Sequence, residues 1–202
     1  MTLDNTRGLL IVGDSNTKSI EFGAGKGKFG ERYPGKRIKA SKISEIDPTL
    51  CNQHRNIAIM CGTNDLQPDG PPPDIPNLVK TLVDKVKQIR VINPKCVVML
   101  VPVLPTRNRQ MNRNIISFNR LVHSWVQECR TSSIIMPGIY QFLDKEELLA
   151  TSLEREDHDG IHIGSRGVSL LVSILKQRIY FGAERRQQKP PRPRSAGSLK
   201  PA

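Results

Sequence analysis

Short apolar runs alternate with amphipathic patterns along this chain, and the alternation restricts the folds that it can adopt. The runs are rich in β-branched residues, and each is followed directly by Gly or Pro; they occupy residues 9–12, 56–61, 96–101 and 133–136. Buried strands of a parallel sheet have this composition. A further, weaker strand is predicted just before Pro34–Gly35.

Helical periodicity fills the intervals between these runs. Apolar residues recur at i, i+3, i+4 and i+7 over 75–92, 112–129 and 165–180, with Ser165 as the expected N-cap of the last helix, and 41–50 predicts a shorter helix. Strands that alternate with helices predict an α/β domain with a parallel sheet and helices on both faces. Ligands of such sheets bind beyond the carboxyl ends of the strands.

Positive charge is concentrated in two segments. The net charge is +12, of which residues 26–42 contribute +6 and residues 184–202 contribute +5. A nearly neutral body with two basic segments favours a polyanionic partner, either nucleic acid or an anionic membrane surface. The plain alternative is that both segments are solvated and aid solubility. Because residues 184–202 are rich in Pro and Arg, we expect a folded domain over 1–183 and a disordered tail after it.

The chain lacks the sequence features of a membrane or secreted protein. No apolar run approaches the length of about 18 residues that a membrane span requires, and the first eight residues contain no apolar signal region. The four cysteines form no Cys-x-x-Cys motif. Reduced, structural thiols and an intracellular, cytoplasmic location are therefore predicted.

Polar residues follow the first run, in the order Gly13, Asp14, Ser15, Asn16. A serine at a strand-to-helix turn presents its hydroxyl at the ligand-binding edge, and its backbone N–H at a helix N-terminus suits an anion. Asp-Ser pairs are also common helix caps. This block alone leaves a catalytic and a structural role for Ser15 open.

A second polar block, Gly62-Thr63-Asn64-Asp65, follows the second run. The glycine permits close approach of the backbone, and Asn64 can offer a side-chain N–H to a ligand at the same edge. A simple turn is the alternative, because these residue types are common in turns.

A third block near the C-terminus contains Asp159 and His162, three residues apart. One short loop could therefore supply a base and the carboxylate that orients it. Asp and His are also metal ligands, but no third or fourth ligand occurs at a suitable spacing. Neither a metal nor an organic cofactor is predicted.

These three blocks, with a glycine between the first and the second, resemble the four ordered blocks of the SGNH hydrolase superfamily. The resemblance extends from Leu9 to Ile179 and departs at Asn16, where the GDSL pattern has leucine. It implies a three-layer α/β/α domain around a mostly parallel five-stranded sheet of flavodoxin-like order. By position, it makes Ser15 the nucleophile, His162 the general base and Asp159 the partner that orients the base.

The resemblance also implies an oxyanion hole. Its donors would be the backbone N–H groups of Ser15 and Gly35 and the side chain of Asn64. Gly35 is preferred to Gly30 because it precedes the helix predicted over 41–50 and because its separation from Asn64 matches the family.

Several shorter sequence segments are similar to the esterase domain of first-open-reading-frame proteins of LINE retrotransposons. They are Tyr33-Pro34-Gly35, Val-Pro-Val-Leu-Pro-Thr at 101–106, Phe118-Asn119-Arg120-Leu121 and the Asp-Gly-Ile-His block. Such proteins accompany the RNA of their element, which would account for both basic segments.

The sequence therefore predicts a serine esterase that acts on a small ester or a lipid and transfers a small acyl group such as acetyl to water. The alternative is a non-enzymatic module that binds nucleic acid or lipid through a hydrolase fold, as part of a retrotransposon RNA-binding protein. A phosphodiesterase is disfavoured, since the chain lacks metal ligands or a paired cationic clamp at suitable spacing.

Overall fold

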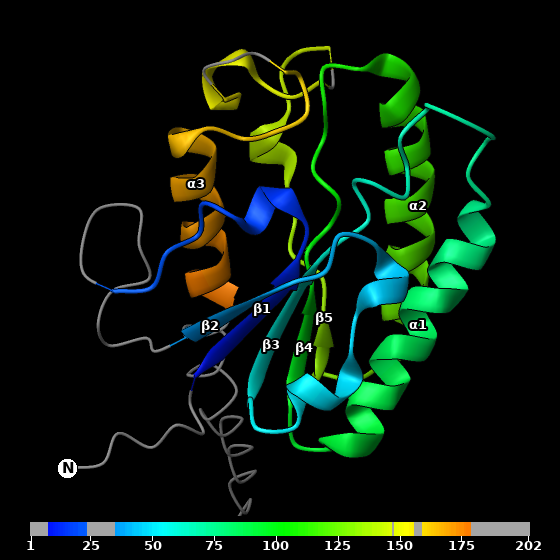
Figure 1. Ribbon diagram of the computed structural model, residues 1–202, viewed down its shortest axis with the longest axis vertical. Helices are drawn as coiled ribbons and strands as arrows, with labels where there is room; N and C mark the ends of the chain where they lie inside the picture. Colours follow the sequence, from blue (N-terminus) through cyan, green and yellow to red (C-terminus); the bar gives the residue numbers. More distant parts are fainter. Residues whose placement is uncertain (1–7, 24–34, 147, 156–158, 179–202) are drawn as a thin grey trace, which may run out of the picture.

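The computed structural model describes residues 8–23, 35–146, 148–155 and 159–178, and its centre is a five-stranded parallel sheet (Figure 1). The strands are β1 (Leu9–Gly13), β2 (Gly35–Lys39), β3 (Asn56–Met60), β4 (Val97–Leu100) and β5 (Ile134–Ile135). Their order across the sheet is β2-β1-β3-β4-β5, and every adjacent pair is parallel. This is the flavodoxin-like order, in which the chain reverses its direction of winding at β1 and β3.

Three long helices complete the predicted three-layer α/β/α architecture, which is confirmed. They are α1 (Ile75–Ile92), α2 (Arg109–Glu128) and α3 (Ser165–Lys176). Helices α1 and α2 lie on one face of the sheet and α3 lies on the other (Figure 1). Asp74 caps α1 by accepting a hydrogen bond from the backbone of Asn77, and Asn108 caps α2 in the same way from Met111. The cap of α3 is Gly164 rather than the predicted Ser165.

Two hydrophobic cores, one on each face of the sheet, hold the layers together. Leu10 and Val12 of β1 point into the core beneath α1 and α2, whereas Leu9 and Ile11 point into the core beneath α3. Alternate residues of a strand face opposite sides, so a strand with helices on both faces must be apolar throughout. All five residues of β1 are buried.

One sequence prediction near β2 is wrong, and another lies outside the described residues. The strand predicted just before Pro34–Gly35 falls within 24–34, which the structure does not describe, and strand β2 begins at Gly35. The helix predicted over 41–50 is replaced by two short 3₁₀ helices, η3 (Ile43–Glu45) and η4 (Pro48–Cys51). Pro48 disfavours a helical conformation at Asp47, and the Asp47 side chain caps η4 instead, so one continuous helix cannot form.

Several further predictions fall partly or wholly outside the described residues. They include the boundary at residue 183, the tail over 184–202 and most of the basic segment over 26–42. Among the described helices, none is long and apolar enough to cross a membrane. Cys51, Cys61, Cys96 and Cys129 are free.

Candidate active site

Ser15 lies just beyond the carboxyl end of β1 and opens a single 3₁₀ turn, η2 (Ser15–Thr17). The preceding residue, Asp14, continues the sheet by donating its backbone N–H to the Met60 carbonyl over 3.1 Å. Its carboxylate then accepts the Asn16 backbone N–H at 3.1 Å. We call residues 14–17 the Ser15 turn. This local capping leaves the Ser15 side chain exposed at the edge of the sheet.

The Asp14 carboxylate also ties the Ser15 turn to the loop that follows β3. Asp14 is only 3% exposed, and its Oδ2 accepts the Thr63 backbone N–H at 3.1 Å. Burial raises the pKa of Asp14, and the hydrogen bonds from Thr63 and Asn16 oppose that rise. The carboxylate thereby fixes Ser15 relative to Asn64, the neighbour of Thr63.

The structure brings Ser15, His162 and Asp159 together from opposite ends of the chain. The His162 Nε2 atom lies 2.7 Å from Ser15 Oγ, and the Nδ1 atom contacts the Asp159 carboxylate. An ionised carboxylate can only accept, so Nδ1 carries a proton. The Nε2 atom of the neutral ring is then free to accept the Ser15 hydroxyl proton.

A short loop, residues 159–164, carries both members of the pair, and we call it the His162 loop. Asp159 Oδ1 accepts the backbone N–H groups of Ile161 at 2.9 Å and of His162 at 2.8 Å. Gly160 between them has a φ of +72°, in the left-handed region that glycine adopts without strain. The turn therefore holds the carboxylate directly beneath the imidazole.

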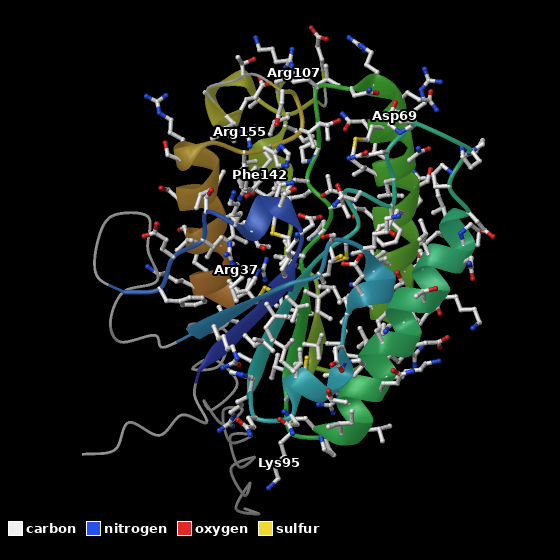
Figure 2. The ribbon with its side chains drawn as sticks, viewed as in Figure 1. Arg37, Asp69, Lys95, Arg107, Phe142 and Arg155 are labelled. Carbon is white, nitrogen blue, oxygen red and sulfur yellow. The ribbon has the colours of Figure 1, made fainter. Side chains whose placement is uncertain are left out.

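The Asp159 carboxylate is ionised at neutral pH. Partial burial alone would raise the pKa of Asp159. The carboxylate also accepts hydrogen bonds from the backbone and side chain of His162 and from the backbone N–H of Ile161. These hydrogen bonds outweigh the effect of burial and lower the pKa to about 2. Arg155 adds an ion pair, with its Nη2 atom 3.1 Å from Asp159 Oδ2. Figure 2 shows Arg155 at the end of the molecule opposite Lys95, on the side where the strands end.

Asn64 follows β3 at the same edge of the sheet and is half-buried. Its Nδ2 atom donates to the Ser41 carbonyl at 3.0 Å, and its Oδ1 atom accepts from Gln67 Nε2 at 3.2 Å. These two contacts fix the orientation of the amide. One amide hydrogen of Asn64 has no acceptor within the described part of the chain, so it can be donated to a ligand.

Gly35, by contrast, lies at the wrong end of the sheet, and its predicted role as an oxyanion donor is wrong. It pairs with Leu9 at the amino end of β1, whereas Gly13 pairs with Lys39 at the carboxyl end. Four residues of strand, about 13 Å, separate the two ends. A side chain at Gly35 would clash with the Phe22 ring, so packing alone accounts for this glycine.

Ser41 occupies the place that was assigned to Gly35, since it lies two residues beyond the carboxyl end of β2. Its backbone N–H donates to Glu45 Oε2 at 2.7 Å, and its carbonyl accepts from Asn64. Ser41 was not predicted as a site residue, because the sequence did not indicate a strand over 35–39. The sequence also indicated no role for Asn16, whose contact with Ile163 joins segments 147 residues apart. Gln67 and Arg155, whose contacts with Asn64 and Asp159 are local, were likewise not predicted.

No group of three His, Cys, Asp or Glu side chains that could hold a metal ion occurs within 8–23, 35–146, 148–155 and 159–178.

Comparison with known proteins identifies similar structures but no similar sequences. No family model matches the chain, and no curated protein matches it significantly. A GDSL-like lipase from Bacteroides thetaiotaomicron superposes with a TM-score of 0.68 at 15% identity, over 89% of this chain and 91% of that one. The chain has the fold of a GDSL-type hydrolase.

Two esterases are also similar in structure. A carbohydrate esterase of family 3 from Talaromyces cellulolyticus superposes with a TM-score of 0.63 at 14% identity, over 88% of this chain and 98% of that one. For an acetyl xylan esterase the TM-score is 0.61 at 15% identity, with 83% and 97% covered. None of these three is described as a retrotransposon protein, and the predicted retrotransposon resemblance stays a prediction.

Proposed function

We propose that this protein is a serine esterase that hydrolyses a carboxylic ester through Ser15, His162 and Asp159. The observation that carries the proposal is the 2.7 Å contact between Ser15 Oγ and His162 Nε2. The other ring nitrogen of His162, Nδ1, contacts the Asp159 carboxylate. Serine is a weak nucleophile until a base takes its proton, and this contact supplies the base. Hydrolytic neighbours of the same fold support the same reaction class.

The proposed reaction has two stages. In the first, His162 takes the Ser15 hydroxyl proton while Oγ bonds to the acyl carbon, and the protonated imidazole then gives that proton to the departing alcohol. In the second, His162 takes a proton from water while the water oxygen attacks the acyl carbon. The Ser15 Oγ–acyl bond then breaks, and the His162 imidazolium returns the proton to Oγ. Asp159 stabilises the imidazolium at both stages.

A negative oxygen develops at each stage and needs hydrogen-bond donors. We propose the Ser15 backbone N–H and Asn64 Nδ2 for this role. The Ser15 N–H has no acceptor within the described residues, so it can be donated to a negative oxygen bound beside Ser15 Oγ. The Ser41 N–H, next to Asn64, is engaged by Glu45 and becomes available if that carboxylate moves away.

Asn64→Ala is expected to lower kcat by about 10²- to 10³-fold, because loss of one oxyanion donor has that cost in other hydrolases. This loss of kcat is measured from the rate of nitrophenyl acetate hydrolysis at saturating ester. Since Asn64 is half-buried, the melting temperature reports separately on folding. A folded Asn64→Ala protein with wild-type kcat would contradict the assignment, and Asn64→Asp should be no faster than Asn64→Ala because it adds negative charge.

For the acyl group we propose a small one such as acetyl, by analogy with the acetyl xylan esterase of the same fold. The test is a hydrolysis screen with nitrophenyl esters of increasing acyl length, run in parallel on wild type and Ser15→Ala. Rates that fall as the chain lengthens support a small acyl pocket. Equal rates for wild type and Ser15→Ala would instead favour a binding module without catalysis.

Nucleic-acid binding is a second candidate function, and the exposed cations of β2 favour it. Lys36, Arg37 and Lys39 are exposed along this edge strand. Most of the remaining basic residues of the two segments lie outside the described residues, within 24–34 and 184–202. Lysines on an edge strand also prevent strand pairing between molecules, which is the competing explanation.

A salt titration of single-stranded RNA binding distinguishes the two explanations of these cations. For four to six neutralised phosphates, log K should fall against log salt with a slope of about −3 to −4 for a single strand. Removal of 184–202 should flatten the slope and leave esterase activity unchanged. Absence of binding by the full chain at low salt would mean that these charges protect the edge and aid solubility.

A further inference from the structure

Two consecutive residues of the Ser15 turn form hydrogen bonds with two consecutive residues of the His162 loop. Ser15 Oγ contacts His162 Nε2 at 2.7 Å, and the Asn16 side-chain Oδ1 accepts the Ile163 backbone N–H at 3.2 Å. Each pair is separated by 147 residues in the sequence. Among the described residues, these two are the hydrogen bonds that join the Ser15 turn to the His162 loop.

The two bonds differ in their surroundings. The Ser15–His162 bond is exposed to solvent, as a site that admits substrate and water requires. The Asn16–Ile163 bond is buried, since Asn16 and Ile163 are each only 4% exposed. Water is scarce there, so no solvent molecule readily replaces the amide oxygen if it is removed. Leucine, the residue that the GDSL pattern has at this position, could not accept this N–H.

Other hydrogen bonds hold the His162 loop from the opposite side. Arg107 N–H donates to the Gly160 carbonyl at 2.6 Å, and Arg155 N–H donates to the His162 carbonyl at 3.0 Å. Gly164 N–H donates to the Leu153 carbonyl at 2.8 Å. These contacts keep the loop folded, but they do not reach the Ser15 turn. Ile163 also packs in the core beneath α3 with Ile11 of β1, but the directional contacts between the Ser15 turn and the His162 loop are the two hydrogen bonds.

We propose that Asn16 is a positioning residue that holds His162 in place while Ser15 is acylated. The inference rests on the proposed function. In the free protein the Ser15 hydroxyl bonds to His162 and keeps the imidazole near it. In the acyl-enzyme, Ser15 Oγ is esterified and has no hydrogen to donate. The Asn16–Ile163 bond is then the one that still joins the Ser15 turn to the His162 loop.

The two stages of the reaction should respond differently to the loss of this bond. Acylation starts from the free protein, in which Ser15 and His162 hold each other. Deacylation requires His162 to activate water beside an acylated Ser15, with the imidazole positioned by the loop alone. A displacement of about 1 Å can lower a rate about a hundredfold. Asn16→Leu, similar in volume but without the acceptor, should slow deacylation about ten- to a hundredfold and acylation much less.

Rapid mixing with nitrophenyl acetate separates the two stages. The expected result for Asn16→Leu is a burst of nitrophenol close to one equivalent, followed by a slow steady state. When deacylation limits turnover, kcat and KM fall together, while kcat/KM stays near the wild-type value. A purely structural loss would lower the burst amplitude in proportion to the folded fraction, and it would not prolong the life of the acyl-enzyme.

Asn93→Leu is the matched control. Asn93 Nδ2 donates to the backbone carbonyls of Cys51 at 3.0 Å and His54 at 2.8 Å. Asn93 follows the C-terminus of α1, at the amino end of the sheet and away from Ser15. This variant also loses side-chain hydrogen bonds to the backbone, so its acyl-enzyme should decay at the wild-type rate even if its melting temperature falls.

The outcomes separate this inference from the proposed function. A wild-type protein that shows neither a nitrophenol burst nor fluorophosphonate labelling refutes the esterase proposal and, with it, the role of Asn16. A wild-type protein that acylates, together with an Asn16→Leu protein that deacylates at the wild-type rate, overturns the role of Asn16 alone. Equal slowing of both stages also overturns it. If Asn16→Leu does not fold, Asn16→Ala removes the same acceptor and gives the same comparison.

Discussion

Ser15→Ala is expected to lower kcat by about 10⁶-fold, the largest effect of any substitution considered for this protein, because loss of the nucleophile in other catalytic triads has that cost. Stability should change little, since the Ser15 side chain is exposed and its contact with the partly buried His162 imidazole is open to solvent. The measurements are hydrolysis of nitrophenyl acetate and covalent labelling by a fluorophosphonate, which reacts with an activated serine. Wild type should be labelled once, and Ser15→Ala should not be labelled.

The control for this prediction is another serine of the same segment. Ser19 is exposed four residues further along the chain, and the described structure records no bond from its hydroxyl. Ser19→Ala should therefore be labelled and turn over as wild type does. Labelling of Ser15→Ala at the wild-type rate would show that the probe reacts elsewhere, and the nucleophile would have to be sought among other residues.

Periodicity and composition were sufficient to predict most of the fold. The run over 9–12 is apolar on both faces, and such a strand is stable only between two layers of helices. Helix α1 begins and ends where the sequence predicts, because Asp74 and Pro76 favour its start and Asn93–Pro94 its end. Strand β2 over Gly35–Lys39 was not predicted, because Lys36, Arg37 and Lys39 obscure the apolar signal of a strand that lies at the edge of the sheet.

The candidate site was predictable where its parts are local in sequence. Asp159 and His162 lie three residues apart on one turn, and Ser15 directly follows a strand, so residue type and position were informative. The position of Ser41 beyond the end of β2 was not predictable, because any residue can offer a backbone N–H and the choice depended on the location of one strand. The hydrogen bonds of Asn16 to Ile163 and of Gln67 to Asn64 were not predictable either, because only the folded chain shows them.

Asp159→Asn is expected to lower kcat by about 10⁴-fold, the cost of the equivalent change in a well-studied triad. An asparagine amide can donate to His162 Nδ1, which would move the ring proton to Nε2. An Nε2 atom that carries a proton cannot accept the Ser15 hydroxyl proton, so the nucleophile is not activated. Nitrophenyl acetate turnover and the rate of fluorophosphonate labelling should fall together, because both require an activated serine.

Asp84→Asn provides the control for this loss of charge. Asp84 is a partly exposed aspartate on α1, and its Oδ2 atom lies 2.9 Å from Lys80 Nζ. The hydrogen bond that Lys80 donates lowers the pKa of the Asp84 carboxyl. This control should keep wild-type turnover. An Asp159→Asn protein within tenfold of wild type would mean that the carboxylate does not set the tautomer.

The two aspartate variants should also differ in the pH dependence of their stability. The pKa of Asp159 is lowered to about 2 in the folded protein, below the value of about 3.9 of an unfolded aspartate. Its ionised form therefore stabilises the fold above pH 4, and that contribution is lost as the pH falls from about 4 to about 2. Within this range wild type should lose part of its stability by protonation of Asp159, and Asp159→Asn should not. The melting temperatures of wild type, Asp159→Asn and Asp84→Asn between pH 2 and pH 7 measure the difference. If wild type and Asp159→Asn lose stability in parallel over that range, the hydrogen bonds to Asp159 do not lower the pKa of its carboxyl in the folded protein.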